Sequence, residues 1–173
     1  VFSLIFPAKL AKVRFQTTNG GLIVRLLICA GGTGGGVYPA LAVHSALTSQ
    51  HPHLETLWVG GEGGMEEELV NRAGISYRSI PAAGVHGVGL RALPGNIAKL
   101  SRGVFASRRI LREFNPDVLF FTGGFVAAPM ALAGRDIPTV LYVPDIEPGL
   151  SLKFISSFAD VVTVTALDSK KYF

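Results

Sequence analysis

Two glycine-rich stretches of this sequence have the residue types and spacing to bind an anion. "AGGTGGG" and "TGGFVAAP" each follow a short apolar run and precede a segment with helical spacing. Glycine allows close backbone approach, and the free N–H groups at a helix N-terminus attract phosphate. We therefore predict phosphate contacts at Gly31, Gly32, Gly34, Gly35, Gly123 and Gly124. The alternative is that both stretches are tight turns without a ligand.

The first stretch also contains Thr33, whose hydroxyl could bind a phosphate or cap the helix that follows. Two common nucleotide motifs do not fit it. A P-loop requires Lys and then Ser or Thr after its last glycine, whereas Val37 and Tyr38 stand there. The dinucleotide fingerprint Gly-x-Gly-x-x-Gly fails because its third glycine would be Val37. Nucleoside triphosphate hydrolysis and nicotinamide or flavin chemistry are therefore disfavoured, while a simple nucleotide-binding module stays open.

Alternating apolar runs and helical patterns must position these loops. We predict short buried strands at Ile23–Cys29, Thr56–Val59, Ile75–Ile80, Val118–Phe121, Thr139–Val143 and Val161–Val164. We predict helices between them at Pro39–Ser49, Met65–Ala73, Leu93–Phe114, Val126–Ala133 and Leu150–Ser157. This alternation indicates an α/β fold, a Rossmann-like parallel sheet with helices on both faces. Ligands of such folds bind at the carboxyl ends of the strands, where the glycine-rich stretches lie.

Two further loops after predicted strands complete this edge of the sheet. "GGEGG" (Gly60–Gly64) precedes Glu66–Glu68, which we interpret as first-turn charges that favour the helix dipole. "PDIEPG" (Pro144–Gly149) follows the fifth strand and contains Asp145, a candidate general base or alternatively a helix cap. Glu147 in the same loop is predicted to be solvated.

The composition excludes several classes of site. The chain has 173 residues, which fits one domain, and its single cysteine, Cys29, cannot form an internal disulfide. We predict Cys29 to be a core residue. The four histidines, His44, His51, His53 and His86, show no metal-ligand spacing, so we predict no metal and no cofactor. Mean hydropathy is +0.42, but no stretch reaches the roughly 18 apolar residues of a membrane span.

The net charge of +4 is modest, but its distribution is uneven. Basic residues without any acid run from Arg91 to Arg112 and interleave with apolar residues at helical spacing. One interpretation is a core helix with a solvated basic face. The other is contact with an anionic bilayer through Leu90, Arg91, Leu93, Arg102, Arg108, Arg109 and Arg112. No nucleic-acid-binding module surrounds these residues, so we predict no nucleic-acid partner.

We divide the chain into three parts. Residues 1–23 form a basic, partly apolar N-terminal extension, interpreted as upstream sequence from a misassigned start or as an interfacial segment. Residues 24–166 form the Rossmann-like domain, and residues 167–173 begin a connection to a further domain.

Three stretches together resemble the MurG family of glycosyltransferases (family 28) over Arg25 to Ala166. "GGTGGGVYPALAV" and "FNPDVLFFTGGFVAAP" resemble its two glycine loops, and "WVGGEGGMEEELV" resembles its second strand and the helix after it. The resemblance implies the N-terminal, acceptor-binding half of a two-domain GT-B enzyme. Such an enzyme transfers N-acetylglucosamine from UDP-N-acetylglucosamine, held by a C-terminal domain, to a polyprenyl-diphosphate-linked muramyl-pentapeptide in peptidoglycan synthesis. It inverts the anomeric carbon without a metal and lies peripherally on the cytoplasmic face of the plasma membrane.

The resemblance also implies that Gly36 and Phe125 belong to the acceptor diphosphate site, but four positions depart from the family pattern. Gly36 stands where the family has His, Phe125 where it has Tyr, Val143 where it has Glu, and Asp145 where it has Asn. We therefore predict Asp145 as the catalytic base. Two alternatives remain: a transferase acting on a different lipid-linked acceptor, and a non-catalytic membrane-recruiting subunit of a split glycosyltransferase.

Overall fold

In a computed structural model of the chain, the described residues are 16–18, 21–82 and 93–173. Their strands form one twisted sheet with the order β4-β3-β2-β5-β6-β7, and all neighbours along this path are parallel. A further short strand, β1, pairs with β2 in the antiparallel sense. The bounds are β1 Gln16–Thr18, β2 Gly21–Ala30, β3 Leu54–Gly61, β4 Ser76–Ile80, β5 Val118–Gly123, β6 Thr139–Val143 and β7 Val161–Val164.

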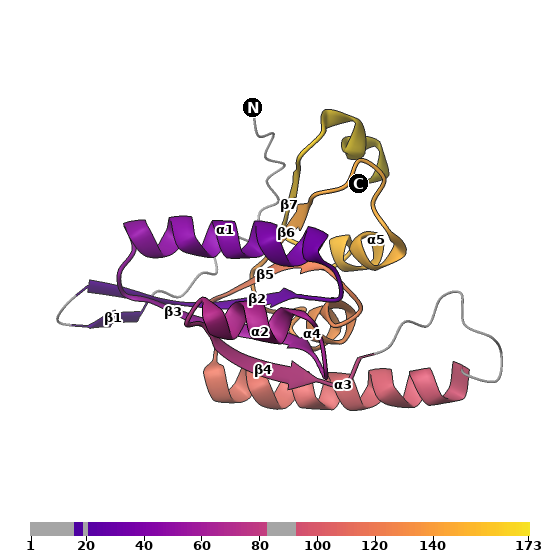
Figure 1. The fold of residues 1–173 in the computed structure, drawn as a ribbon, viewed down its shortest axis with the longest axis horizontal. Helices are drawn as coiled ribbons and strands as arrows, with labels where there is room; N and C mark the ends of the chain where they lie inside the picture. The colour runs from indigo at the N-terminus through magenta and orange to yellow at the C-terminus, as the bar shows by residue number, and fades with distance from the viewer. Residues whose placement is uncertain (1–15, 19–20, 83–92) are drawn as a thin grey trace.

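The helices cover both faces of this sheet (Figure 1). Their bounds are α1 Gly34–Gln50, α2 Glu66–Arg72, α3 Leu93–Phe114, α4 Ala127–Ala133 and α5 Leu150–Ser156, followed by a 3-10 helix, η2, at Leu167–Tyr172. Helices α1 and α2 pack on one face, and α3, α4 and α5 pack on the other. The predicted Rossmann-like sheet with helices on both faces is thereby confirmed.

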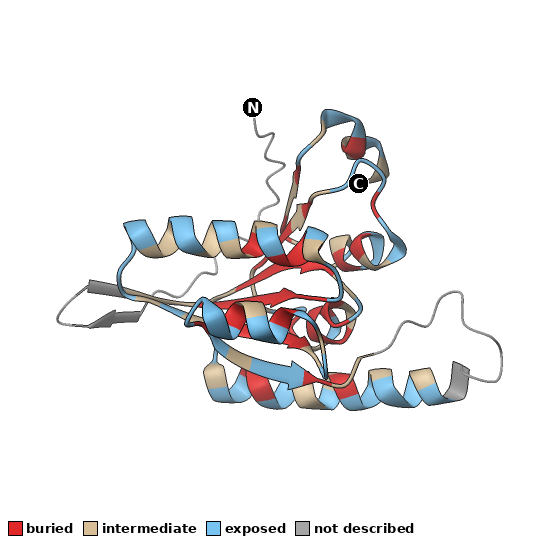
Figure 2. Ribbon diagram, viewed as in Figure 1, coloured by how far each residue is buried: buried red, intermediate tan, exposed pale blue. Residues whose placement is uncertain are grey.

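The two faces of β2 show why this strand is central. Leu27 and Cys29 belong to the cluster under α3, α4 and α5, whereas Leu26, Ile28 and Ala30 belong to the cluster under α1 and α2. Successive side chains of a strand point to opposite faces, so a strand covered on both sides is apolar throughout. Figure 2 shows the resulting buried layer in the central strands, with exposed residues on the outer sides of the helices, on the edge strand β4 and in the loops. Cys29 is a core residue as predicted, and burial raises the pKa of its thiol.

Two elements differ from the sequence expectation. Helix α1 begins at Gly34 rather than Pro39, because the glycines themselves adopt the first helical turn, and Pro39 lies inside the helix. Strand β2 begins at Gly21 and pairs with β1, so the proposed boundary at residue 24 falls inside a strand. None of the helices in the described ranges is both long enough and apolar enough to cross a bilayer.

Candidate functional site

The strand order changes direction between β2 and β5, and the two glycine stretches meet at this point. In doubly wound sheets the crevice at such a reversal is the usual ligand site. A pocket of about 440 Å³ opens here at the carboxyl ends of the strands. Its lining comes from three loops and comprises Gly31, Gly32, Thr33, Gly35, Gly36, Thr122, Gly123, Gly124, Phe125, Pro144, Asp145 and Gly149–Leu152.

The first wall is the beginning of helix α1. Thr33 occupies the N-cap position in an extended conformation but makes no side-chain cap hydrogen bond. The N–H groups of Gly36 and Val37 donate to the Thr33 carbonyl at 3.2 and 3.3 Å. The N–H groups of Gly34 and Gly35 belong to the first turn, where a helix provides no acceptor. The helix therefore directs unsatisfied donors and the positive end of its dipole at this edge of the sheet.

Gly36 joins this wall to strand β5. Thr122 donates its hydroxyl to the Gly36 carbonyl at 2.8 Å, and both residues are buried. A Cβ atom at Gly36 would lie only 3.3 Å from the Thr122 Oγ1. A larger side chain at this position requires Thr122 to shift, so the glycine and the threonine fit one another.

The third wall is the loop between β6 and α5. Asp145 is exposed on this wall, and the N-cap of α5 is Gly149, so Asp145 does not cap that helix. Ser169 in η2 donates its hydroxyl toward the carbonyl oxygens of Asp145 and Ile146, at 3.0 Å each. Ser151 donates to the Gly124 carbonyl at 2.8 Å. The Ser151 bond holds the third wall against the loop after β5, which forms the second wall, and Asp145 lines the pocket between them.

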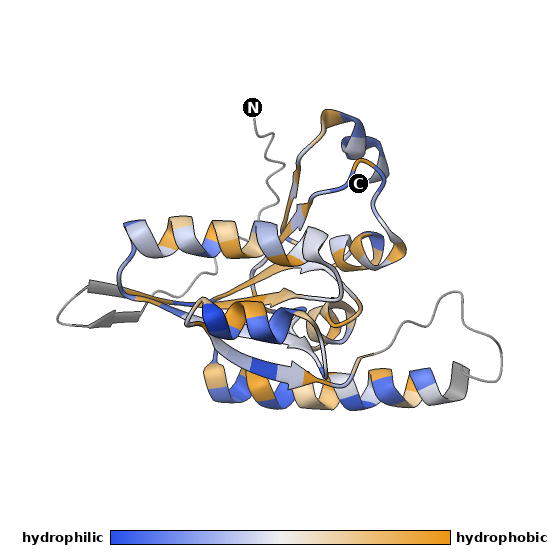
Figure 3. Cartoon of the chain, viewed as in Figure 1, coloured by the Kyte–Doolittle hydropathy of each residue, from blue (hydrophilic) through white to orange (hydrophobic). Residues whose placement is uncertain are grey.

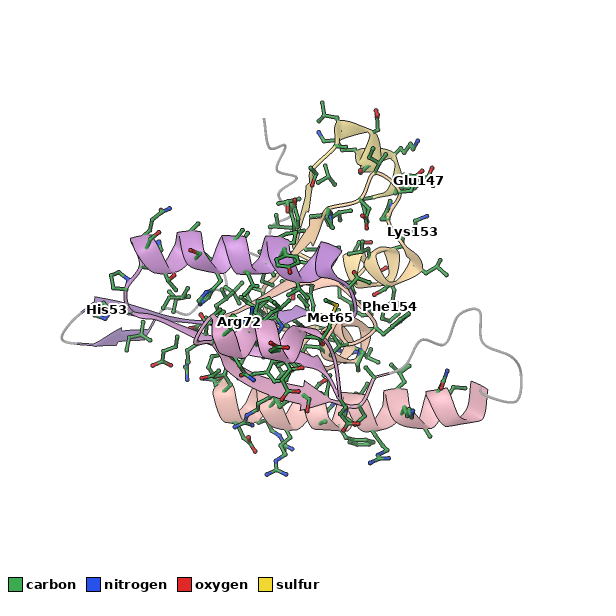
Figure 4. The ribbon with its side chains drawn as sticks, in the orientation of Figure 1. His53, Met65, Arg72, Glu147, Lys153 and Phe154 are labelled. Atoms are coloured by element: carbon green, nitrogen blue, oxygen red, sulfur yellow. The ribbon has the colours of Figure 1, made fainter. Side chains whose placement is uncertain are left out.

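Apolar side chains stand at the rim of this pocket. Phe125 is 59% exposed and Leu150 is 54% exposed, and both line it. Phe154 lies one helical turn beyond Leu150 and is also exposed, with Lys153 beside it and Glu147 on the loop before the helix (Figure 4). Backbone donors at the floor and exposed hydrocarbon at the rim suit a ligand that carries both phosphate and an apolar group.

Comparison with known proteins shows which family has this arrangement. Residues 26–164 match the Glycosyltransferase family 28 N-terminal domain. The chain belongs to this family. It is similar to UDP-N-acetylglucosamine--N-acetylmuramyl-(pentapeptide) pyrophosphoryl-undecaprenol N-acetylglucosamine transferases. The identity is 38% over 156 residues in Desulforudis audaxviator, covering 87% of this chain and 41% of the relative. With the protein from Roseiflexus sp. the identity is 36% over 171 residues, covering 86% of this chain and 39% of the relative.

A solved structure supports the same assignment. The crystal structure of Acinetobacter baumannii MurG superposes with a TM-score of 0.69 at 31% identity, covering 80% of this chain and 40% of that one. The resemblance to the MurG family expected from the sequence is thereby confirmed. The chain spans about two fifths of the length of the curated relatives that it matches.

Within the family 28 domain, most of the predicted phosphate-site residues come together. All of them line the pocket except Gly34, which lies in the first turn of α1 with the Tyr38 ring over it. Asp145 is in the same pocket, on the opposite wall. The contacts of these residues with a ligand stay predictions.

Glu66 is a feature of the family 28 domain that the sequence did not reveal. It lies in the first turn of α2, as expected, but it is only 1% exposed and its carboxylate accepts hydrogen bonds from two loops. Burial and the nearby Glu66 carboxylate raise the pKa of Tyr77, whose hydroxyl donates to the Gly61 carbonyl. The unusual number of glycines around Glu66 was the available signal, because a buried acid requires close backbone donors.

The predicted membrane-facing residues lie on or before α3. Leu90 and Arg91 are outside the described residues, and so is the side chain of Leu93. The four arginines further along, Arg102, Arg108, Arg109 and Arg112, are exposed. Arg109 is not a free cation, because its Nε donates to Glu113 at 2.8 Å. Glu113 also accepts from Arg78 on β4, which reduces the positive charge at this end of the helix.

The histidines lie away from the pocket where the structure describes them. His53 precedes β3, at the opposite end of the sheet from Glu147 and Phe154 (Figure 4). His86 is outside the described ranges. Within those ranges, no group of three or more His, Cys, Asp or Glu side chains is arranged to hold a metal ion.

Proposed function

We propose that this chain is the acceptor- and membrane-binding domain of an inverting glycosyltransferase. The whole enzyme transfers N-acetylglucosamine from UDP-N-acetylglucosamine to a polyprenyl-diphosphate-linked muramyl-pentapeptide in peptidoglycan synthesis. The donor is held by a second domain, which corresponds to the part of the relatives that this chain does not cover. The observation that carries the proposal is the pocket at the β2–β5 reversal, which combines backbone donors with an apolar rim.

The floor of the pocket suits a diphosphate. Helix α1 has 17 residues, so its dipole is fully developed, and the N–H groups of Gly34 and Gly35 have no acceptor within the helix. Such an N-terminus binds phosphate without a lysine or a metal. Gly123 and Gly124, both with positive φ, bring the backbone of the second loop to the same point. We assign the two phosphoryl groups of the acceptor to this floor.

The rim suits a hydrocarbon chain. Phe125 and Leu150 are exposed apolar side chains beside the diphosphate floor, and burying either against a polyprenyl chain removes apolar area from water. A nucleotide would instead require polar partners for its base and ribose at this rim. The pocket therefore favours a lipid-linked diphosphate over a free nucleotide.

Asp145 is the proposed proton acceptor. The acceptor hydroxyl attacks C1 of N-acetylglucosamine, the C1–O bond to UDP breaks, and the hydroxyl proton passes to the Asp145 carboxylate. An exposed carboxylate on the pocket wall satisfies the requirement that a base reach the attacking hydroxyl. A neighbouring diphosphate repels this carboxylate, so Asp145 favours turnover at some cost to acceptor binding.

Replacing Asp145 with Asn separates these two effects. In an enzyme that contains both domains, loss of a general base lowers kcat about 10²-fold or more. A position that only contacts the acceptor would instead show unchanged kcat and a lower acceptor KM after Asp145→Asn, and this result would assign the base elsewhere.

The outer side of α3 is the proposed membrane surface. Ile97 and Phe105 are 51% and 68% exposed, and at 100° per residue they share one side of the helix with Arg102, Arg108 and Arg112. Gly103, Ser107 and Ile110 are buried on the opposite side. Figure 3 shows the alternation of hydrophobic and hydrophilic residues along α3. Such a surface supports a peripheral position of the enzyme on the cytoplasmic face of the membrane, where each basic residue near anionic lipid contributes about 1 kcal/mol.

Vesicle binding tests the membrane surface. We expect this chain to co-sediment with vesicles containing 30% phosphatidylglycerol and not with pure phosphatidylcholine, and salt to release it. Changing Arg102, Arg108 and Arg112 together to Gln weakens binding, whereas changing Arg72 and Arg135, which are exposed away from α3, does not. Equal binding by both variants would mean that the basic side of α3 is only solvated.

Ligand binding tests the acceptor site itself. We expect calorimetry to show that this chain binds farnesyl diphosphate more tightly than farnesyl monophosphate, and UDP-N-acetylglucosamine weakly or not at all. Micromolar affinity for UDP-N-acetylglucosamine would overturn the assignment of this domain to the acceptor.

A further inference from the structure

The carboxylate of Glu66 is buried behind the phosphate floor and does not line the pocket. Its neighbours in the sequence, Glu67 and Glu68, are exposed, whereas Glu66 is 1% exposed. Removing a carboxylate from water is costly unless hydrogen bonds replace its hydration. Two backbone groups do so: the N–H of Gly61 donates to Oε1 at 2.8 Å, and the N–H of Gly32 donates to Oε2 at 3.2 Å.

Glycines allow this carboxylate to reach the backbone. A Cβ atom at Gly31 or Gly64 would overlap the Glu66 carboxylate, and one at Gly60 would lie 2.6 Å from its Oε1. These three glycines come from two loops, one after β2 and one after β3. Glu66 therefore links the phosphate loop to its neighbour through contacts that no larger residue would permit.

The peptide group between Gly31 and Gly32 is held from both sides. Its N–H points to Glu66, and its carbonyl points the opposite way, toward the second glycine loop. A Cβ atom at Gly124 would overlap the Gly31 carbonyl oxygen, and Gly124 has a φ of +93°, which favours glycine. The peptide therefore lies across the β2–β5 reversal with neither of its polar groups directed into the pocket.

We propose that Glu66 is a positioning residue for the diphosphate site. By fixing the Gly31–Gly32 peptide against Gly124, it sets the direction in which Thr33 and the free N–H groups of Gly34 and Gly35 face the ligand. This inference rests on the proposed function, because it assigns a diphosphate to those groups. Pre-organised donors bind more tightly, since no ordering of the loop remains to be done on binding.

The direction in which one substitution changes ligand affinity distinguishes a positioning role from a purely electrostatic one. Glu66→Gln keeps the size of the side chain but leaves one acceptor oxygen for two N–H donors, so either Gly32 or Gly61 loses its acceptor. If the carboxylate acted only through its negative charge, removing it would strengthen anion binding. If it positions the loop, removing it weakens binding although the local charge becomes more favourable.

The experiment measures farnesyl diphosphate affinity by calorimetry for this chain and its Glu66→Gln variant. We expect binding about tenfold weaker in the variant, as for one charge-assisted hydrogen bond lost to the ligand. Glu68→Gln is the matched control, because Glu68 is exposed, pairs with Arg72 and lies two residues away on the same helix. Affinity that is unchanged or stronger in Glu66→Gln would overturn the proposal.

Hydrogen exchange of the Gly32 and Gly61 amides provides a readout that needs no ligand. We expect protection of both in the parent chain and in Glu68→Gln, and its loss at one of them in Glu66→Gln. If the parent chain does not bind farnesyl diphosphate, the diphosphate assignment fails, while retained protection of both amides in Glu66→Gln independently overturns the positioning role.

A second pair of variants covers the case in which Glu66→Gln does not fold. Gly124→Ala pushes on the same peptide from its carbonyl side, and Gly74→Ala is its control. Gly74 also has a positive φ, +71°, but its Cβ would meet nothing within 4 Å. Both variants carry backbone strain, and only the first displaces the peptide. We expect weaker farnesyl diphosphate binding in Gly124→Ala alone, and equal affinities would overturn the proposal.

Discussion

The two glycine loops that follow β2 and β3 look alike in sequence but serve different purposes. The loop after β3, Gly60–Gly64, surrounds a carboxylate of its own chain and is shaped by Glu66. The loop after β2, Gly31–Gly36, has one side against that carboxylate and the other side open to the pocket. Glycine is needed in the first case for internal packing, and under the proposed function it gives a ligand access in the second.

This difference shows how a glycine-rich loop should be interpreted. A Cβ at Gly64 would overlap the Glu66 carboxylate, so packing within the chain explains a glycine at this position without a ligand. Gly35 is exposed on the pocket wall, and a Cβ there would meet only the Thr33 hydroxyl, at 3.8 Å. A glycine that packing does not require, at the start of a helix and beside a pocket, indicates close approach by something outside the chain.

The largest expected effect comes from removing the internal partner of the β3 loop. Glu66→Ala leaves a cavity and removes the acceptor of two part-buried N–H groups, those of Gly32 and Gly61. Each unsatisfied donor costs about 1–3 kcal/mol, so we expect a loss of about 3–5 kcal/mol in the free energy of unfolding. Urea denaturation measures it, with Glu68→Ala as the control expected to change stability by less than about 0.5 kcal/mol. Equal losses would mean that Glu66 does not organise the loops.

A glycine-to-alanine substitution in each loop compares a glycine that packing requires with one that it does not. Gly64→Ala drives a Cβ into the Glu66 carboxylate and should cost about 1–3 kcal/mol of unfolding free energy. Gly35→Ala lies in an open helical turn and should leave stability unchanged or raise it by up to about 1 kcal/mol. Its effect appears instead in ligand binding, where we expect farnesyl diphosphate affinity to fall about tenfold because approach to one N–H is blocked. A Gly35→Ala variant that is destabilised and binds normally would reverse the comparison.

A hydroxyl substitution tests the contact that fixes the pocket side of the β2 loop. Thr122→Val removes the donor to the Gly36 carbonyl and should cost about 1 kcal/mol of unfolding free energy. Thr56→Val is the opposite case, because the Thr56 hydroxyl is buried without a hydrogen-bond partner in the structure. We expect that variant to be neutral or more stable by up to about 1 kcal/mol. Thermal and urea unfolding measure the stability of both variants. Destabilisation in both, or stabilisation in both, would contradict the assigned contacts.

The sequence was sufficient for the sheet because its central strands are buried on both faces, although the edge strand β4 is largely exposed. Each of the six parallel strands was predicted within a few residues, since continuous apolar runs such as Val118–Phe121 have no other stable environment. The start of α1 was missed because glycine has a low helix propensity, and the first turn is recognised only from its backbone hydrogen bonds to the Thr33 carbonyl. Strand β1 was missed because three residues carry no periodic signal.

The pocket was predicted in outline for a topological reason. The loops after β2, β5 and β6 converge because parallel strands end at the same edge of the sheet. Glu66 was not recognised because acidic residues are frequent in the first turn of helices, and nothing in "MEEE" shows which of three glutamates turns inward. Burial of that one side chain depends on the twist of β3 against β2, which is a tertiary property. The ion pairs of Glu113 were missed for the same reason, since Arg78 is distant in the sequence.

Glu113 can be compared with Glu66, because its carboxylate also accepts two hydrogen bonds but lies at the surface. Its donors are the guanidinium groups of Arg109 and Arg78, which lower its pKa from 4.5 to about 2. A carboxyl group whose pKa is lower in the folded state stabilises the fold above its unfolded pKa of 4.5, and this contribution disappears as the pH falls toward 2. The group is fully exposed, so solvent and salt screen the pair and the effect is the smallest expected here. Urea unfolding at pH 7 and pH 2.5 should show a small stability difference between the parent chain and Glu113→Gln at pH 7 only, reduced in 1 M NaCl. A Glu113→Gln loss as large as the loss predicted for Glu66→Ala would show that burial is not what distinguishes the two carboxylates.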